Sequence, residues 1–445
     1  MNRTIKLMTA LAAWPILLGA CALPFVTPDS TGKSGKPTGA FGPEARMASN
    51  NLGLVFASLL DDRVLATGGS TSRGSLDDAE IYDAQHNTWS ALPSMPVARN
   101  QHTATALLDG SVLVAGGTSA TGDVLDTAAL FHSDGTWTPT GRMSQPRWGH
   151  TALRLNDGRV LIIGGWSRAY PGPGVPPDLT ADLFDPSTRR FTPVASPPGV
   201  LWGSMFASLP DGRVLMAGGE DPTQGSTSQA WLYDPKTNAW TSARPMPVSR
   251  TQGVATTLAS GKVLVAGGYQ TQASPAAAPP QPTSGAILYD PVQNAWSKIA
   301  DAPTAIQQGF GGAVLLRDGR ALTFAVDFLG GATGNVSAVF YDPATGTWST
   351  GSPIPVSSSN GGISPIVLQS GKVLVVLGST SVLFDPERTA PGPPRAPIHP
   401  LASPQLTPWL VLAAALLLLI LGAQYGQAQF RSRRRPDASP KGVVH

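Results

Sequence analysis

Residues 150–165 read HTALRLNDGRVLIIGG, and after a longer connection residues 181–192 read ADLFDPSTRRFT. In the first stretch two apolar runs flank Asp157-Gly158, a sequence typical of a tight β-hairpin because glycine accepts the positive φ of such turns. The second stretch supplies a third strand that ends at Asp185, where the following proline stops strand pairing. A fourth strand begins at Phe191. This part of the chain therefore predicts a unit of four short strands, a to d.

The unit recurs seven times along the chain. An aromatic residue opens each strand d, and 23 or 25 residues later lies a valine or alanine of strand b in the next copy. The aromatic residues are Phe41, Trp89, Trp137, Phe191, Trp240, Trp296 and Trp348. A glycine pair follows strand b in the first five copies, at 68–69, 116–117, 164–165, 218–219 and 267–268. Periods of about 50 residues with several short strands are typical of propeller blades.

The first and last copies are each incomplete. Residues 41–47 match a strand d that no a, b or c strand precedes, and the last copy, up to Asp385, has strands a to c without a strand d. A blade is covered on both faces only if it has two neighbours, so the row of blades must close into a ring. We therefore predict an all-β, seven-bladed propeller over residues 41–386 whose last blade is completed by the N-terminal strand.

The glycine pairs, the Tyr-Asp steps, the spaced tryptophans and the Met-Pro-x-x-Arg sequences at 95–99 and 246–250 resemble kelch repeats. The resemblance covers most of the chain and implies a bacterial secreted or membrane-anchored protein similar to the central domain of galactose oxidase or to the sialic acid mutarotases. Galactose-oxidase chemistry needs copper and a tyrosine crosslinked to cysteine. The sole cysteine, Cys21, lies in the leader, which excludes that activity, and we expect no cofactor or metal.

Residues 1–22 have the features of a signal peptide. Arg3 and Lys6 precede an apolar run, and small residues follow it, as in secretory signals. The sequence 18–21, Leu-Gly-Ala-Cys, also resembles a bacterial lipobox, so lipidation of Cys21, plain cleavage and an uncleaved anchor stay open. A linker over 23–40 leads to the propeller, and a Pro-rich linker over 387–407 leaves it.

Residues 409–423 are almost wholly apolar, and with the stretch to Phe430 the segment 408–430 provides the roughly 20 residues that a transmembrane helix needs. Four arginines in the tail 431–445 predict that the C-terminus is cytoplasmic. We therefore expect a single-pass cell-membrane protein whose propeller is extracellular or periplasmic. The leader and tail hold seven of the 31 basic and one of the 28 acidic residues. The rest is slightly acidic, and a nucleic-acid partner is not expected.

The connections between strands b and c vary in length, whereas the a–b hairpins and c–d turns are short and uniform. Variable loops on a rigid scaffold commonly carry function, so the face with the b–c connections and d–a links is the candidate binding surface. Arg99, Arg147 and Arg250 occupy equivalent d–a positions, where other copies have Asn51 and Gln307. Their guanidinium groups either converge on the ring axis to hold an anion or cap backbone carbonyls within the blades.

Aromatic residues gather in the same connections. Trp148 and Trp202 share a repeat position, and the b–c connections add Trp166, Tyr170 and Tyr269. Their rings either present flat faces to a sugar or pack between blades. His102 and His150 are also repeat-equivalent, which indicates a structural role for both and not a metal pair.

The sequence thus predicts a non-enzymatic, membrane-anchored module that binds a protein or a glycan at the b–c/d–a face. Two alternatives stay open: a carbohydrate-active enzyme similar to the sialic acid mutarotases or epimerases, with an arginine on the sugar carboxylate, and a structural cell-envelope protein. Fold alone does not decide among them. No catalytic residue is assigned, because no nucleophile–base or phosphate-binding motif recurs.

Overall fold

A computed structural model describes residues 37–388 except 38, 50, 169–177, 200–201, 222–224, 272–281, 307–311, 328–334 and 355–362. These residues form strands and turns. No helix long and apolar enough to cross a membrane occurs among them. The predicted signal peptide, the lipobox cysteine, the apolar segment 408–430 and the basic tail all lie outside the described residues.

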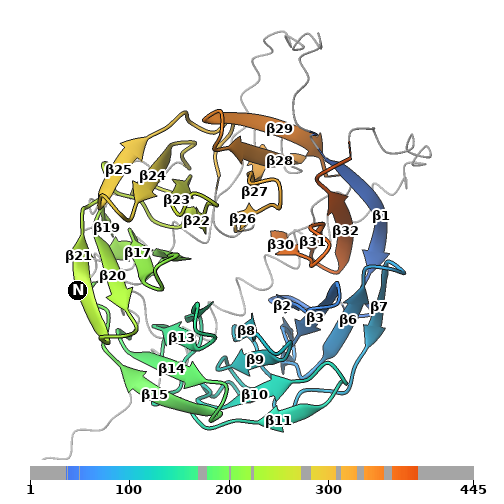
Figure 1. Cartoon of the computed structure of the whole chain (residues 1–445). Coiled ribbons are helices and arrows are strands. Elements are labelled where there is room, and N and C mark those ends of the chain that lie inside the picture. Colours follow the sequence, from blue (N-terminus) through green and yellow to red (C-terminus); the bar gives the residue numbers. More distant parts are fainter. Residues whose placement is uncertain are drawn as a thin grey trace, which may run out of the picture. The chain divides into compact units, whose positions relative to one another are not determined.

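Seven four-stranded antiparallel sheets surround a common axis as blades of a propeller (Figure 1). From the axis outward, blade 1 consists of β2 (Val55–Ser58), β3 (Arg63–Thr67), β6 (Ala79–Asp83) and β7 (Thr88–Ala91). Blade 2 consists of β8 (Thr103–Ala106), β9 (Val112–Ala115), β10 (Ala128–Phe131) and β11 (Trp137–Pro139). Blade 3 consists of β12 (Thr151–Arg154), β13 (Val160–Ile163), β14 (Ala181–Asp185) and β15 (Arg190–Val194). Blade 4 consists of β16 (Met205–Ser208), β17 (Val214–Ala217), β20 (Ala230–Asp234) and β21 (Ala239–Ala243). Blade 5 consists of β22 (Val254–Thr257), β23 (Val263–Ala266), β24 (Ala286–Asp290) and β25 (Ala295–Lys298).

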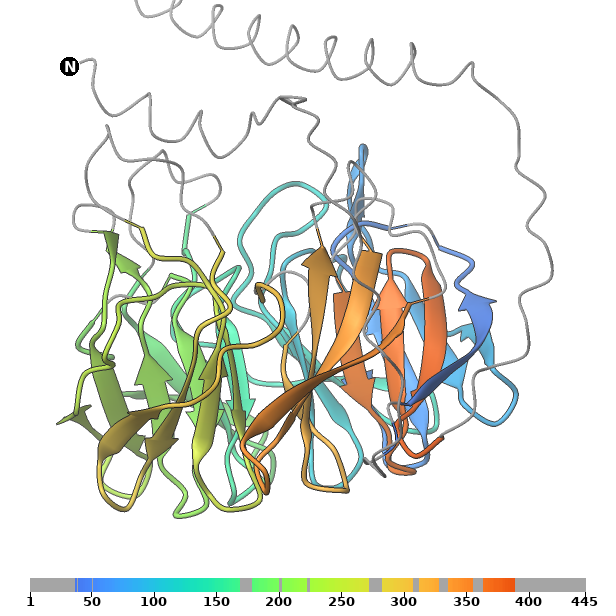
Figure 2. The same ribbon diagram turned by 90° about the horizontal axis from the view of Figure 1, so that it is seen from above.

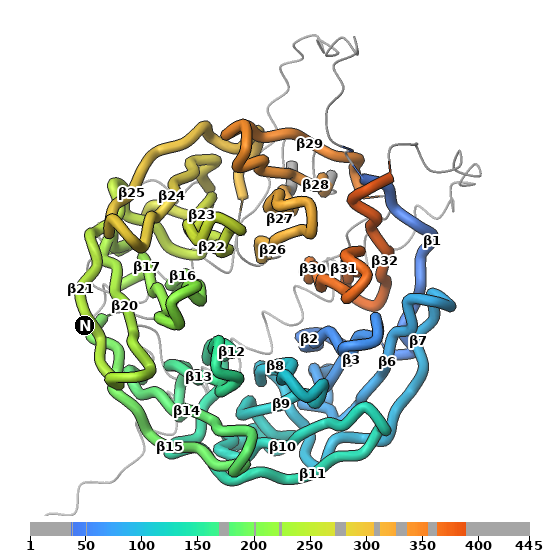
Figure 3. Tube along the Cα trace, viewed as in Figure 1, coloured from blue at the N-terminus to red at the C-terminus, as the bar shows by residue number. Residues whose placement is uncertain are grey.

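Blade 6 consists of β26 (Val314–Leu315), β27 (Ala321–Asp327), β28 (Asn335–Asp342) and β29 (Thr347–Pro353). Blade 7 consists of β30 (Ile363–Val367), β31 (Val373–Leu377), β32 (Thr380–Asp385) and β1 (Ala40–Arg46). The tube in Figure 3 shows the first strand of each blade nearest the axis and the fourth at the circumference. The predicted fold, an all-β propeller of seven blades, is confirmed.

Two blades carry a small extra hairpin in the b–c connection. In blade 1 it pairs β4 (Ser70–Thr71) with β5 (Gly74–Ser75), and in blade 4 it pairs β18 (Glu220–Asp221) with β19 (Gly225–Ser226). Figure 2 shows the ring from its edge, with these connections on one side and the a–b hairpins on the other. We call the side with the b–c connections and d–a links the loop face, and the opposite side the hairpin face.

The N-terminal strand closes the ring as the sequence predicts. β1 pairs antiparallel with β32, with Phe41 opposite Phe384 and Arg46 opposite Thr380. Arg320 of blade 6 adds a second closure, because its guanidinium donates to the carbonyls of Pro37 at 2.6 Å and Pro386 at 3.3 Å. Arg320 is buried. One side chain thus ties both ends of the propeller to a neighbouring blade.

In every blade the aromatic residue near the end of strand c lies opposite the aromatic residue that opens strand d. The ring centroids of these pairs are between 4.8 and 5.3 Å apart; the pairs are Tyr82–Trp89, Phe131–Trp137, Phe184–Phe191, Tyr233–Trp240, Tyr289–Trp296, Tyr341–Trp348 and Phe384–Phe41. Aromatic cross-strand pairs stabilise antiparallel sheets by roughly 0.2–1 kcal/mol each. The repeated aromatic spacing in the sequence therefore corresponds to this cross-strand pair, and Phe41 completes the pair of blade 7.

The hydrophobic core is divided among the interfaces between blades. Each of the seven clusters of buried residues joins two neighbouring blades, including one between blades 7 and 1 that contains Ala45 and Met47. Strand β9, Val112–Ala115, is buried at every residue. Strands covered on both faces are expected to be apolar throughout, which explains the unbroken apolar runs of strand b.

The glycine pair marks a crossing of two chain segments. Gly116 and Gly117 have φ values of 66° and 91°. A Cβ atom would lie 2.5 Å from the Arg147 carbonyl oxygen at Gly116, and 2.5 Å from the Asn100 carbonyl oxygen at Gly117. Only glycine allows both the positive φ and this approach. The pair thus lets the d–a links of two successive blades pass directly against the end of strand b.

Candidate functional site

The three predicted arginines are buried, and backbone carbonyls receive their hydrogen bonds. Arg99 Nη1 donates to the carbonyls of Gly116 and Thr127, both at 2.8 Å. Arg250 Nη1 donates to the equivalent carbonyls of Gly267 at 3.1 Å and Gly285 at 2.9 Å. Burial lowers the pKa of Arg99 to about 10, which leaves the group charged at neutral pH.

Arg147 makes the same contacts and adds an ion pair. Its Nη1 donates to the carbonyls of Gly164 and Thr180 at 2.8 and 3.1 Å. Its Nη2 donates to Asp182 at 2.7 Å, and both side chains are buried. Asp182 also accepts hydrogen bonds from the backbone and hydroxyl of Ser144. This geometry is the one expected for arginines that cap backbone carbonyls, and we therefore leave the three arginines out of the site.

These arginines connect neighbouring blades. The Arg99 backbone belongs to blade 1, because its N–H donates to Leu76 and its carbonyl accepts from Gly69, while its side chain binds blade 2. Asn51 takes this role in the first copy, with its amide on the Gly68 carbonyl at 3.3 Å. In the sixth copy the equivalent residue is Ile306, whose carbonyl accepts from Gly268. The sequence alignment with Gln307 was wrong by one residue.

The two repeat-equivalent histidines are also interblade groups. His102 Nε2 lies 2.9 Å from the Thr67 hydroxyl of blade 1, and His150 Nε2 lies 2.9 Å from the Thr103 hydroxyl of blade 2. Both rings are buried. Burial, reinforced by the neighbouring arginine, lowers the pKa of each imidazole to about 3. Both are therefore neutral near pH 7 and act as packed hydrogen-bonding groups.

On the loop face one backbone arrangement recurs in blades 1 to 5. The residue after the glycine pair bonds to a residue of the d–a link, and we call these two places the rim positions. The rim pairs are Leu52 with Ser70, Asn100 with Thr118, Trp148 with Trp166, Trp202 with Glu220, and Thr251 with Tyr269. Residues that face each other in such an antiparallel pair project their side chains to the same side. The scaffold is therefore constant, and the side chains differ.

Blade 3 shows how the rim displays its side chains. The rings of Trp148 and Trp166 stack with centroids 4.9 Å apart and planes 28° apart. Trp148 Nε1 donates to the Arg168 carbonyl at 3.0 Å. Both tryptophans remain partly exposed. The pair is thus held in one orientation, although neither ring is inside the core.

Blade 4 adds a carboxylate that the sequence analysis missed. Glu220 N–H donates to the Trp202 carbonyl at 2.9 Å, and 37% of Trp202 is exposed. Burial raises the pKa of Glu220. Its place directly after Gly218-Gly219, where Trp166 and Tyr269 follow their own glycine pairs, is the signal that identifies it.

The hairpin that carries Glu220 is bound to the next blade. Ser226, paired with Glu220 in the β18–β19 hairpin, donates its N–H to the Thr271 carbonyl at 3.2 Å, and Thr271 N–H returns a bond to Ser226 Oγ at 3.1 Å. Thr271 lies two residues after Tyr269. The aromatic and acidic rim residues of three successive blades, 3 to 5, are grouped here as the aromatic arc: Trp148, Trp166, Trp202, Glu220 and Tyr269. Tyr170 lies outside the described residues.

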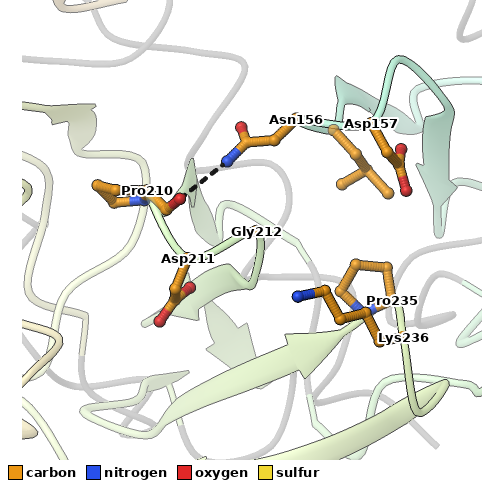
Figure 4. A pocket seen from close by; sticks show the side chains of 8 residues that line it. Asn156, Asp157, Pro210, Asp211, Gly212, Pro235 and Lys236 are labelled. Carbon is orange, nitrogen blue, oxygen red and sulfur yellow. Dashed lines mark hydrogen bonds between the residues drawn. The ribbon is translucent and has the colours of Figure 1, made fainter.

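The hairpin face has a different hollow, between blades 3 and 4 (Figure 4). It has a volume of about 270 Å³ and is lined in part by Asp157, Asp211 and Lys236. Each aspartate already pairs with the arginine two residues later, at 2.7 Å in both cases. The side chain of Asn156 donates to the Pro210 carbonyl at 3.2 Å across the hollow. These polar groups are occupied in connecting the two blades.

Comparison with known proteins supports the fold. The Kelch motif model matches residues 57–96 and 207–247. A novel fungal alcohol oxidase of the AA5 family in complex with copper is 16% identical, with a TM-score of 0.59 over 78% of this chain and 76% of that chain. The structure of YjhT is also 16% identical, with a TM-score of 0.52 over 69% of this chain and 99% of that chain. At these identities the likeness concerns the fold. None of the curated proteins compared with the chain matches it.

The described residues contain no group of three histidine, cysteine, aspartate or glutamate side chains that could hold a metal ion, and Cys21 is the sole cysteine in the sequence. What the chain shares with these proteins is the fold. The Kelch motif matches, the two structural likenesses and the seven closed blades together show that this protein is a kelch-repeat β-propeller.

Proposed function

We propose that this propeller is a binding module whose ligand, a glycan or a protein, contacts the aromatic arc on the loop face. The rim carries this proposal. Two backbone bonds hold the rim pair in blades 1, 2, 3 and 5, and one bond holds it in blade 4, yet the side chains change from leucine and serine to tryptophan, tyrosine and glutamate. Partly exposed rings that are fixed in orientation lose little conformational entropy when a ligand binds.

The enzymatic alternative retains one supporting observation. Glu220 is a titratable carboxyl group beside Trp202, with its pKa raised by burial, and shifted carboxyl groups are common at catalytic sites. The arginines that a mutarotase-like reaction would use on a sugar carboxylate instead bind carbonyls within the ring. We therefore favour binding without catalysis. Chemical conversion of a glycan by the protein, abolished in Glu220→Gln, would establish the alternative.

The proposal includes attachment to the cell membrane, with the propeller extracellular or periplasmic. It rests on the apolar segment 408–430, the arginines that follow it and the lipobox-like sequence at Cys21. Protease treatment of intact cells should digest the propeller and leave a tail epitope protected. Radiolabelled fatty acid should enter the protein and fail to enter Cys21→Ser. A propeller that stays protected in intact cells would overturn this topology.

The binding proposal can be tested with the purified full-length protein. We expect retention of ligand on a glycan array or capture of a protein partner, and loss of either signal in the double variant Trp202→Ala/Glu220→Ala. The matched control is Leu52→Ala/Ser70→Ala, which changes the same rim positions in blade 1. No ligand or partner at high protein concentration would favour a purely structural envelope protein, and equal losses in both double variants would show that binding does not depend on the aromatic arc.

A further inference from the structure

We infer that the aromatic arc binds a neutral glycan, with pyranose rings against its indole faces and sugar hydroxyls on the Glu220 carboxyl group. This inference rests on the proposed function and narrows its ligand to one chemical class. It also separates this chain from a protein that recognises acidic sugars through arginine. Three features of the arc support it: the fixed orientation of its tryptophan pair, the sign of its charge and the small number of its side chains.

The geometry suits a flat ligand that has polar edges. The Trp148 ring is held by its hydrogen bond to the Arg168 carbonyl and by stacking on Trp166. A pyranose has a face of C–H groups and a rim of hydroxyls, and C–H groups carry a partial positive charge that suits the negative face of an aromatic ring. Rings with a polar group placed nearby are typical of small-molecule sites.

The chain segment that carries Glu220 is held on two sides. Its backbone is bonded to Trp202 on one side, and its hairpin partner Ser226 is bonded to Thr271 of blade 5 on the other. A carboxylate accepts bonds from two neighbouring hydroxyls, and a protonated carboxyl can also donate one. Either form of Glu220 can therefore form hydrogen bonds with sugar hydroxyls.

The charge of the arc opposes an acidic ligand. The nearby guanidinium groups of Arg147 and Arg250 are buried and bonded to carbonyls, so they offer no fork to a sugar carboxylate. A carboxylate ligand beside Glu220 would meet a like charge and lose solvent, which costs free energy. Arg168 is an exposed cation next to the tryptophan pair. Its replacement therefore provides a direct test of an anionic alternative.

The small number of side chains in the arc favours a glycan over a protein, because a stable protein interface takes about 20–30 residues on each side. Stable protein interfaces bury about 800 Å² on each partner around a central cluster of apolar anchors. At the centre of the arc a tryptophan that is 37% exposed adjoins a carboxyl group. One ring and one carboxyl match one sugar unit. Spread over three successive blades, the arc matches a short oligosaccharide.

Blade 1 supplies an internal control. It has the same extra hairpin in the b–c connection, with Ser70 paired to Leu52 where blade 4 has Glu220 paired to Trp202. Two backbone bonds join Leu52 to Ser70 and one joins Glu220 to Trp202, but the repeat positions correspond, so substitutions in blade 1 test whether any change of the rim disturbs the loop face. If the ligand binds to the arc, substitutions in blade 4 should weaken binding and the corresponding substitutions in blade 1 should not.

The experiment measures binding of the full-length protein by titration calorimetry and tryptophan fluorescence. The probes are tetrasaccharides of β-linked glucose, α-linked mannose and β-linked galactose, with lactose and 3′-sialyllactose as a neutral and acidic pair. We expect at least one neutral tetrasaccharide to bind, and lactose to bind at least as well as its sialylated form. Trp202→Ala should weaken binding by about tenfold or more, as for a central anchor, and Glu220→Gln by a smaller factor. Leu52→Ala, Ser70→Ala and Arg168→Gln should leave the affinity unchanged.

Several outcomes would overturn the inference. They are no binding of any neutral probe at millimolar concentration, preference for 3′-sialyllactose that Arg168→Gln abolishes, and affinity that is indifferent to Trp202→Ala. A protein partner captured through the arc, in the absence of glycan binding, would reject the neutral-glycan inference and leave the binding module intact. If neither glycan nor protein binds, both proposals fail.

Discussion

Arg147 and Trp148 are neighbours in the chain but belong to two different regions of the molecule. The arginine side chain lies in the layer between blades and binds three acceptors there, whereas the tryptophan lies on the rim and stays partly exposed. The same contrast separates Arg99 from Asn100, which is partly exposed, whereas Thr251, which follows Arg250, is itself buried. Buried polar groups have to satisfy one another, so the interblade layer is committed to stability. The exposed side chains of the rim do not have to form hydrogen bonds within the protein, and they are available to a ligand.

The largest effect should come from removing the closing strand. Deletion of 37–47 removes β1 from blade 7, Ala45 and Met47 from the adjoining cluster, and an acceptor of Arg320. We expect the loss to exceed the roughly 5–15 kcal/mol of a typical domain, so that thermal scans of the variant show no cooperative transition. Deletion of 26–36, of equal length and outside the described residues, is the control. Unchanged melting of the 37–47 variant would refute closure by β1.

The next largest effect should come from the arginine that has an anionic partner. Arg147→Ala leaves Asp182 buried without its counter-ion, which typically costs about 3–5 kcal/mol. Arg250→Ala leaves only carbonyls without a donor and should cost about 1–3 kcal/mol. Denaturant unfolding measures both, and in Arg147→Ala/Asp182→Ala the loss should be smaller than the sum of the single losses. Equal losses for the two arginines would contradict the role of the ion pair.

An intermediate effect should appear as a dependence of stability on pH. His102 and His150 have a pKa of about 3 in the fold, below the ordinary 6.5, so the unfolded chain binds more protons between these values. Stability should therefore fall as pH falls from about 6.5 toward 3, by up to about 1.4 kcal/mol per pH unit for each histidine. The pKa of Asp185 is lowered chiefly by its Ser187 hydrogen bond, so protonation of this carboxylate reduces stability only below about pH 3.8.

The check on the histidines is urea unfolding at a series of pH values. His102→Ser/His150→Ser should be less stable at pH 7, because Thr67 and Thr103 lose a partner, but its stability should change less between pH 6.5 and 4. Serine is the residue that blade 4 has at this position. A slope identical to that of the parent protein would show that other groups titrate in this window.

The smallest effects on stability are expected at the rim. Trp202 and Leu52 are 37% and 65% exposed, so Trp202→Ala and Leu52→Ala should each cost less than about 1 kcal/mol in denaturant unfolding, whatever they do to binding. This result would sharpen the separation between the two regions. A loss for Trp202→Ala as large as that for Arg250→Ala would mean that Trp202 is a packing residue, and the aromatic arc would lose its central member.

Much of the molecule could be predicted from the repeats. The Asp-Gly hairpins, the aromatic spacing and the incomplete end copies were sufficient for seven blades and for closure by the strand at Phe41, because each is a local pattern repeated with a constant period. Four of the five members of the arc were also identified by type, as aromatic residues in variable connections. Glu220 was missed because a single glutamate in a loop resembles any solvated charge.

The roles of the arginines could not be read from spacing. Both interpretations, anion ligand and carbonyl cap, place an arginine at the same repeat position, and they differ only in where the guanidinium points. The Gln307 alignment failed for a related reason, since the backbone bond from Gly268 to Ile306 is made between blades. Neither fact is present in the local sequence.

The sequence by itself determined the number of strands per blade, the number of blades and the place where the ring closes, because periodic apolar, glycine and aromatic residues encode local geometry that every copy repeats. Tertiary structure alone decided which polar residues are committed to the fold and which remain available. That decision depends on carbonyl groups from other blades, tens of residues away, that reach Arg99, Arg147 and Arg250 and leave the aromatic arc at the surface.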